Sequence, residues 1–353
     1  MLRQLSLIIL IVFRCLQNGA AETDEHWQTI VQFDNDLLTG TDDGYTNGAR
    51  VAFARQLPAD SSTHNFIQNT LLSLTGAERD DPLSNFRFPD ENGLHLQYGI
   101  GLSQLMFTPK SPVPVTPPPG ERPYAGWLGL EFSLQASVGD SAGTATVSIG
   151  ATGRHSYAGD TQKWVHQNIS DSPVFQGWDS QVPTELTVNV HLDHKQRLTF
   201  WDKTRRWPIQ VDGFYEWGMA LGNLRTDAYL GALIRVGYNL RTTYASPRVQ
   251  LGSFTEAIFE NDHSTDANFS LYGFAGLRGY AVLHDITLDG PLFHDWDESV
   301  NSEPWVGEFS FGIAARWHWA EISLSHTLRS DEFEDQRNLS RYGSVLLRLD
   351  VSF

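Results

Sequence analysis

Two polar stretches of the chain hold the residues best suited to chemistry. The first, residues 33–48, contains Asn35, Asp36 and Thr46 among several glycines. Carboxylate, amide and hydroxyl oxygens are the groups that calcium prefers in proteins, so this stretch could hold the cation through Asp36. A plain turn would use the same residue types, because Asn, Asp and Gly tolerate left-handed backbone conformations. The residues alone leave both interpretations open.

The second stretch, residues 160–181, contains His166. An imidazole can accept a proton from water near neutral pH, although a lone histidine in a loop is more often structural. Asp160 can cap a short helix over residues 160–169, and on such a helix Gln162 and His166 lie on one face. A cation and His166 together would form a site that activates water for hydrolysis.

Three familiar site patterns are not met. The nucleophilic Gly-x-Ser-x-Gly pattern fails because residues 101–105 lack the second glycine, and serine catalysis outside this pattern stays open. His191 and His194 are three residues apart on a predicted strand, which puts their rings on opposite faces and disfavours a zinc site. The run from Asp34 has its glycine one place late and Tyr45 at the twelfth position, so it does not fit a helix-loop-helix calcium loop.

The first 21 residues predict a cleaved secretory signal. Arg3 supplies a positive start, residues 5–13 a short apolar core, and residues 19–21 a small-residue cleavage point. This core is too short to span a bilayer, and no later stretch approaches the ~18 apolar residues of a membrane helix. Cys15, the one cysteine, lies in this segment, so no disulfide is expected in the mature chain. We expect residues 22–353 to form a single folded domain.

The chain is acidic, with a formal net charge of -17, and loss of the two arginines in the signal would leave -19. Such a charge repels phosphate backbones, so no nucleic acid partner is expected. Acidic clusters, among them Asp42-Asp43 and residues 295–298, fall between strand-like runs. Solvated loops are the simplest interpretation of these clusters, and contact with divalent cations is the alternative.

Alternation with period two recurs along the chain and indicates an all-β architecture. In the last segment Val345, Leu347 and Leu349 fall on one face, while Ser344 and Arg348 fall on the other. The first face suits lipid and the second suits water. Twelve such segments are expected, at residues 27–37, 45–57, 94–107, 122–139, 143–152, 185–201, 207–222, 225–239, 268–285, 305–319, 320–330 and 340–353.

An even number of antiparallel strands of about 9–11 residues or more is what a closed outer-membrane barrel requires. Closure matters because an open sheet edge would leave amide groups without partners in hydrocarbon. The sequence therefore predicts a twelve-stranded antiparallel transmembrane β-barrel of the outer membrane, with a short α-helix in one loop. The proline run at residues 112–119 is expected to be a stiff extended loop, and glycines within strands, such as Gly126, to mark bulges or close backbone approach.

Aromatic residues gather near the ends of the predicted strands, which fits girdles at the two membrane interfaces. Ordinary core packing is the alternative for any one of them. These residues are Trp27, Trp127, Trp201, Trp207, Trp217, Trp305, Trp317, Trp319, Tyr45, Tyr124 and Tyr342.

Seven short motifs, in order and spacing, resemble the outer-membrane lipid A 3-O-deacylases over nearly the whole mature sequence. Each motif is weak alone, and the specificity comes from the set. The motifs are Asn35-Asp36, Tyr45-Thr46-Asn47-Gly48, Met106-Phe107-Thr108-Pro109, Glu121-Arg122-Pro123-Tyr124-Ala125-Gly126, Thr161-Gln162-Lys163-Trp164-Val165-His166, Gln176-Gly177-Trp178-Asp179-Ser180-Gln181, and the ending from Glu332-Phe333 to Phe353.

The resemblance implies an active site between the barrel wall and a loop helix, facing the outer leaflet. It implies calcium-dependent hydrolysis of the 3′-O-linked acyloxyacyl ester of lipid A, with lipopolysaccharide as the substrate. In this sequence His166 matches the general base, Asp36 matches the calcium-site aspartate, and Asn35 and Thr46 match the polar residues beside it. A family acidic residue after the base falls near residues 171–173 and has no clear counterpart here.

We further expect Lys110, Arg122 and Gln162 to contact the substrate. Lys110 is the nearest counterpart of a family lysine after the third strand, in a proline-rich loop that has diverged. The chain is expected to act as a monomer among outer-membrane lipids. Two alternatives remain at this point, namely an outer-membrane phospholipase, which would use glycerophospholipid and a serine, and a non-enzymatic barrel that serves as a pore or structural protein.

Overall fold

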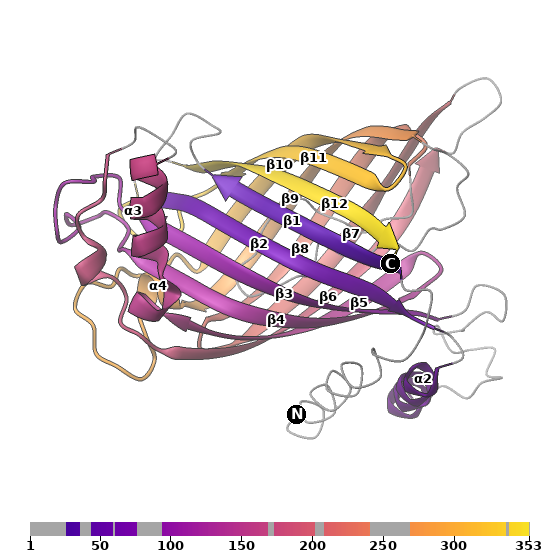
Figure 1. Cartoon of the computed structure of the whole chain (residues 1–353), viewed down its shortest axis with the longest axis horizontal. Coiled ribbons are helices and arrows are strands. Elements are labelled where there is room, and N and C mark those ends of the chain that lie inside the picture. The colour runs from indigo at the N-terminus through magenta and orange to yellow at the C-terminus, as the bar shows by residue number, and fades with distance from the viewer. Residues whose placement is uncertain are drawn as a thin grey trace.

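The computed structural model describes residues 26–35, 44–58, 61–75, 94–168, 173–201, 208–240, 269–336 and 339–352. Within them, twelve antiparallel strands form one closed barrel, in which β1 pairs with β12 (Figure 1). The strands are β1 His26–Asn35, β2 Gly44–Leu57, β3 His95–Thr108, β4 Ala125–Val138, β5 Ser141–Thr152, β6 Leu186–Trp201, β7 Ile209–Gly222, β8 Arg225–Tyr238, β9 Phe269–Asp285, β10 Trp305–Trp317, β11 Ala320–Arg329 and β12 Ser340–Ser352. The helical segments are α2 Ser62–Thr75, η2 Gly153–Ser156, α3 Ala158–Asn168, η3 Trp178–Ser180 and α4 Ile286–Asp289.

The register between β1 and β12 fixes the two ends of the barrel. His26 faces Ser352 at one end of this pair, and Asn35 faces Gly343 at the other. Because successive strands run in opposite directions, the connections that follow β1, β3, β5, β7, β9 and β11 share one end, which we call the site rim. Helices α3 and α4 lie at the site rim, and α2 lies at the opposite end (Figure 1).

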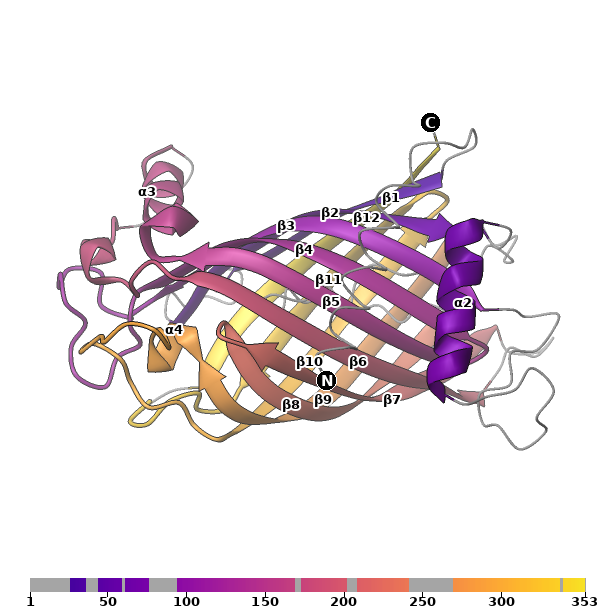
Figure 2. The ribbon, with the colours of Figure 1, turned by 90° about the horizontal axis from the view of Figure 1, so that it is seen from below.

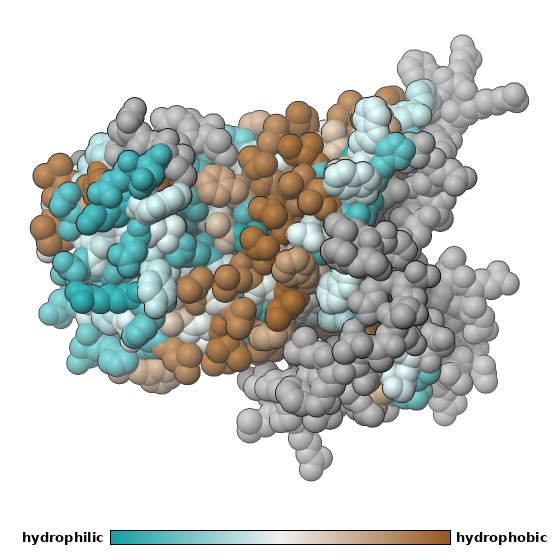
Figure 3. Space-filling view, viewed as in Figure 1, coloured by the Kyte–Doolittle hydropathy of each residue, from teal (hydrophilic) through white to brown (hydrophobic). Residues whose placement is uncertain are grey.

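The wall of the barrel is apolar outside and polar inside. On β1, Val31 and Phe33 are about 40% exposed, whereas Gln32 and Asp34 between them are buried. The same alternation on the other strands produces an apolar band across the middle of the molecule, and the surface on the site-rim side of this band is more polar (Figure 3). This pattern is the one a lipid-facing wall requires.

Charged side chains fill the lumen in pairs. Arg50 makes two contacts of 3.0 Å with Glu131, and both side chains are almost completely buried. Arg235 lies 2.6 Å from Asp212 in the same way. A buried charge without a partner is very costly, so these pairs make a polar interior possible. The lumen is thus occupied by side chains of the barrel itself.

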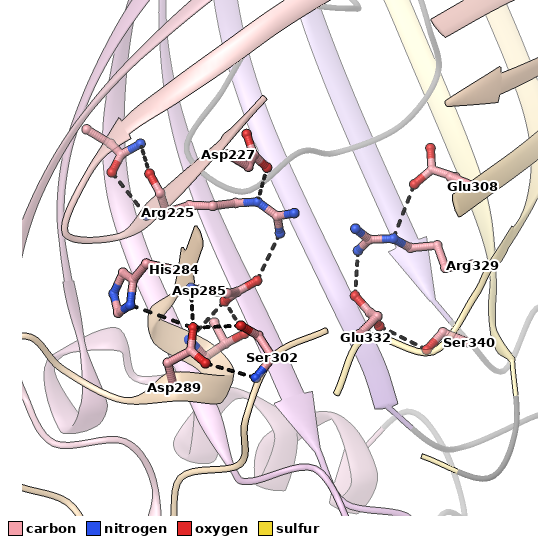
Figure 4. Close-up of polar contacts among 12 residues, drawn as sticks. Arg225, Asp227, His284, Asp285, Asp289, Ser302, Glu308, Arg329, Glu332 and Ser340 are labelled. Carbon is pink, nitrogen blue, oxygen red and sulfur yellow. Dashed lines mark hydrogen bonds and ion pairs between the residues drawn. The ribbon is translucent and has the colours of Figure 1, made fainter. Parts of the chain in front are cut away.

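A second set of ion pairs links strand ends and loops at the site rim (Figure 4). Arg329 lies 2.6 Å from Glu332, whose carboxylate also lies 3.2 Å from Arg122. Arg225 lies 2.9 Å from Asp285 at the start of α4. We call these five residues the mouth seal. They come from β8, β9, β11 and two connections, so the seal joins different sides of the barrel.

Helices α2 and α3 lie against the outside of the wall (Figures 1 and 2). Ile67 of α2 is fully buried in a cluster with Leu96 and Tyr98, on the same outward face that carries exposed Leu102 further along β3. Among the described residues no helix is both long and apolar enough to cross a bilayer.

The predicted fold is confirmed, since all twelve expected segments correspond to strands and the expected loop helix to α3. The girdle prediction is wrong for Trp127, which is fully buried in a cluster with Leu224, Ile286 and Tyr342 inside the rim. Tyr124 and Tyr342 are likewise buried, whereas Trp305, Trp317 and Trp319 are exposed as a girdle requires. Helix α2 was not expected, and the predicted signal lies outside the described residues.

The pairing of lumen charges makes a measurable prediction. Replacing Arg50 with leucine leaves the buried Glu131 carboxylate without its ion-pair partner, which should lower the free energy of unfolding by about 3–5 kcal/mol. Replacing both residues with leucine should cost clearly less than either single change. Urea unfolding of the detergent-folded barrel, followed by the gel mobility of unheated samples, measures all three. Equal stability of Arg50→Leu and wild type would contradict this role for the pair.

Candidate active site

Helix α3 is fixed to the outer face of β3 and β4. Gln104 on β3 donates from Nε2 to the Ser156 carbonyl at 2.6 Å and to Thr161 Oγ1 at 3.3 Å. On β4, Gly126 leaves room for the start of the helix, since a Cβ there would lie 2.5 Å from the Cβ of Ala158. The prediction that Gly126 marks a close backbone approach is therefore confirmed, and the first turn of α3 is anchored on the wall.

The face of α3 that meets residues 173–178 carries the residues expected to do chemistry. Ala158 and Gln162 are buried, and His166, one further turn along, is half-buried. Lys163 and Gln167, each one residue further along the helix, are exposed. Spacing of four residues puts Ala158, Gln162 and His166 on one face, as the sequence predicts for Gln162 and His166.

The imidazole of His166 is held by one strong hydrogen bond. Its Nδ1 lies 2.7 Å from the carbonyl oxygen of Pro173, and its ring packs near Phe175, 6.2 Å between centroids. A carbonyl can only accept, so Nδ1 must carry the proton and Nε2 keeps its lone pair. The backbone at Pro173 thus orients the histidine.

The proline-rich loop supports the segment that supplies this carbonyl. The backbone amide of Gln176 donates to the Pro112 carbonyl at 3.0 Å, and Ser180 Oγ donates to the Val115 carbonyl at 2.8 Å. Gly177 lies so close to the Tyr124 ring that a Cβ would be 2.2 Å from it. The predicted stiff loop between β3 and β4 therefore supports residues 173–181 at the site rim through these hydrogen bonds.

The other half of the expected site lies at the end of β1 and the start of β2. Asn35 is the last residue of β1 and faces Asn47 of β2, so two amide side chains stand on adjacent strands. A bulge between Tyr45 and Asn47 leaves Thr46 as an extra residue in the pairing with β3. The side chain of Thr46 and the whole of Asp36 lie outside the described residues.

The two halves share the site rim but are not joined by a described contact. His166 contacts Pro173 and Phe175, and no hydrogen bond links it to Asn35 within the described part of the chain. That part also contains no group of three His, Cys, Asp or Glu residues able to hold a metal ion. The predicted calcium site at Asp36 stays a prediction, because Asp36 lies outside the described residues.

The three residues expected to bind substrate are placed very differently. Lys110 is exposed just after β3, and Gln162 is buried under α3. Arg122 belongs to the mouth seal, where it donates to Glu332 and to Thr287 Oγ1 at 2.8 Å. Burial raises the pKa of Glu332, but the attraction of Arg329 and Arg122 lowers it to about 2, so this carboxylate stays charged. These contacts within the protein explain the burial of Arg122 without a substrate, and its predicted role in substrate binding stays a prediction.

The anchoring of α3 can be tested with two matched glycine changes. In Gly126→Ala the new methyl would lie 2.2 Å from Ser156 Oγ and 2.5 Å from the Ala158 Cβ, which should lift the start of α3 from the wall. In Gly279→Ala the methyl meets nothing within 4 Å. We expect trypsin to cleave after Lys163 several-fold faster in Gly126→Ala, with Gly279→Ala like wild type. Equal cleavage in all three proteins would rule out the anchor.

Comparisons with known proteins agree with this architecture. The family model described as outer membrane protein LpxR matches residues 5–351. The structure of LpxR from Salmonella typhimurium superposes with a TM-score of 0.69 at 17% identity, covering 91% of this chain and 99% of that one.

More distant barrels also superpose. The β domain of the Bordetella autotransporter BrkA gives a TM-score of 0.44 at 9% identity, over 93% of this chain and 99% of that one. The translocator domain of NalP from Neisseria meningitidis gives 0.37 at 8% identity, over 98% and 95%. No curated protein sequence matches significantly. With the family model spanning nearly the whole chain, this protein belongs to the outer membrane protein LpxR family, the outer-membrane lipid A deacylases that its motifs resemble.

Proposed function

We propose that this chain hydrolyses the 3′-O-linked acyloxyacyl ester of lipid A, with His166 as the general base and water as the nucleophile. The main support for this proposal is the 2.7 Å hydrogen bond between His166 Nδ1 and the Pro173 carbonyl. It fixes the tautomer in which Nε2 can accept a proton. The side chain is half-buried on a helix outside the barrel, where a lipid in the outer leaflet could reach it.

The reaction would proceed in two proton transfers. Nε2 of His166 takes a proton from water as the oxygen attacks the acyl carbon, and a tetrahedral intermediate forms. The imidazolium then donates this proton to the leaving sugar oxygen while the carbon–oxygen ester bond breaks. The products are the free fatty acid, which carries its secondary acyl chain, and lipid A with a free hydroxyl. Nδ1 keeps its hydrogen bond to Pro173 throughout.

Calcium is part of the proposal through Asp36. Asn35, the residue before Asp36 in the chain, faces Asn47 at the adjoining strand ends, and Thr46 is the extra residue at the bulge, so these strand ends carry amide and hydroxyl groups of the kind calcium prefers. Bound there, calcium would supply positive charge for an oxyanion. The described residues offer no alternative cluster for it.

The alternatives are less well supported. A phospholipase of the serine type needs a serine hydrogen-bonded to its histidine, but within the described residues the hydrogen bond of His166 goes to the Pro173 carbonyl. A pore needs an open lumen, but paired side chains such as Arg50 and Glu131 occupy this one and the mouth seal crosses its rim. Neither alternative gives a role to an oriented histidine on the outer wall.

The base is tested by His166→Ala. Loss of a general base should lower the rate of deacylation by ~10²–10⁴ while the barrel still folds. His155→Ala is the matched control, because His155 is an exposed histidine in the preceding segment η2 and should keep full activity. Mass spectrometry of lipid A from cells that make each protein reports the product. Undiminished product from His166→Ala would remove His166 from the mechanism.

Calcium is tested separately with a chelator. Removal of calcium should abolish deacylation in membranes by wild type, and added calcium, but not magnesium, should restore it, since magnesium binds such flexible oxygen sites less well. Asp36→Asn should need far more calcium than wild type. If deacylation proceeds at full rate in excess chelator, calcium has no part in the reaction.

A further inference from the structure

We propose that the groove between α3 and residues 173–181 binds sugar hydroxyls of the substrate head group. The groove has a volume of ≈ 640 Å³, within the range of about 300–1,000 Å³ typical of small-ligand sites. Helix α3 lies outside the barrel at the site rim (Figure 2), and Lys163 and Gln167 are among the residues of this helix that line the groove. The inference rests on the proposed function, because it assigns a second part of the same substrate.

Two buried polar atoms in the groove lining have no partner in the described structure. Gln162 accepts a hydrogen bond from Trp178 Nε1 at 2.7 Å through Oε1, and its Nε2 is a buried donor without an acceptor. Gln181 donates from Nε2 to the Trp178 carbonyl at 2.7 Å, and its Oε1 is a buried acceptor without a donor. Buried polar groups in proteins are almost always satisfied, so this pair of amides points to a ligand.

The chemistry of the two amides selects the kind of ligand. One offers a donor and the other an acceptor. A hydroxyl group both donates and accepts, whereas an ionised phosphate mainly accepts and an ammonium group only donates. Sugars present several hydroxyls in a fixed arrangement, so a sugar can satisfy both amides at once.

The charges of the groove agree with a neutral ligand. Its lining holds two basic residues, Arg154 and Lys163, and two acidic ones, Asp160 and Asp179. Arg154 lies 2.8 Å from Asp179, so one of these charges of each sign is already paired. A phosphate site would show an excess of basic groups. The balance here favours the sugar over the phosphates of the same head group.

Aromatic rings complete the site and connect it to the base. Tyr157 has a left-handed backbone, φ 54°, and leaves its ring 57% exposed at the edge of the groove. A ring presented in this way can pack against the apolar C–H face of a sugar. At the other edge Phe175 lines the groove and also contacts the His166 ring. A sugar in the groove would therefore sit one residue away from the proposed base.

The test uses an isosteric change. Gln162→Glu keeps the oxygen that accepts from Trp178 but replaces the free donor with an acceptor. Asn168→Asp puts the same charge on an exposed position of α3 outside the groove lining and serves as the control. The probe is fully deacylated lipopolysaccharide, a soluble phosphorylated oligosaccharide, and its dephosphorylated form. Saturation-transfer NMR with the full mature chain in detergent micelles measures binding to wild type and to each variant.

We expect the oligosaccharide to bind wild type, His166→Ala and Asn168→Asp alike, and Gln162→Glu about tenfold more weakly. Removal of the phosphates should change these affinities by less than threefold. No binding to wild type, equal binding to Gln162→Glu, or loss of binding on dephosphorylation would each overturn the sugar site. The outcome is independent of catalysis, because failure of the proposed function would appear as deacylation by His166→Ala while binding of the sugar persisted.

Discussion

Pairing of β1 with β12 closes the twelve-stranded sheet into a barrel. Once the sheet is closed, every strand has two neighbours and the backbone amides of the wall are satisfied in hydrocarbon. Closure also creates a lumen, and paired charges such as Arg235 with Asp212 lie buried in it. With the inside occupied, chemistry on a membrane lipid has to take place outside the wall or at a rim.

The position of α3 follows from this arrangement. The connection after β5 folds back over the outer face of β3 and β4, where Gln104 and Gly126 receive it. The proline-rich loop then holds residues 173–181 beside the helix, and the Pro173 carbonyl orients His166. A histidine so placed lies outside the lumen. The same two segments enclose the groove lined by Gln162 and Gln181, each of which has one buried amide atom without a hydrogen-bond partner.

Sequence alone predicts most of the fold, because lipid outside and water-like groups inside impose a strict alternation on every strand. The prediction fails for aromatic residues that are buried inside the site rim, because they lie near strand ends as the residues of a membrane-interface girdle do. Trp127 follows the rule for a girdle by position but faces inward, where its Nε1 donates to Thr187. Helix α2 escapes prediction because polar residues, among them His64 and Asn65, interrupt its apolar spacing.

For the site, residue types and order single out His166 and its helix face, but the groups that orient it are invisible in the sequence. The Pro173 carbonyl belongs to the backbone, and backbone acceptors leave no mark on residue type. Gln104 is equally hard to find, since an outward glutamine on a strand has no distinctive pattern. Asp36, the central residue of the calcium proposal, rests on its motif, because it lies outside the described residues.

We infer that α3 and the ends of β1 and β2 form one site, although no described contact joins His166 to Asn35. A cysteine pair tests this directly, because the one native cysteine, Cys15, lies in the predicted signal. Val165→Cys with Asn47→Cys should form a disulfide on oxidation in membranes that contain lipopolysaccharide, as should the control pair Val31→Cys with Val51→Cys, which face each other on β1 and β2. If the second pair cross-links and the first does not, the two halves do not meet and do not form a shared site.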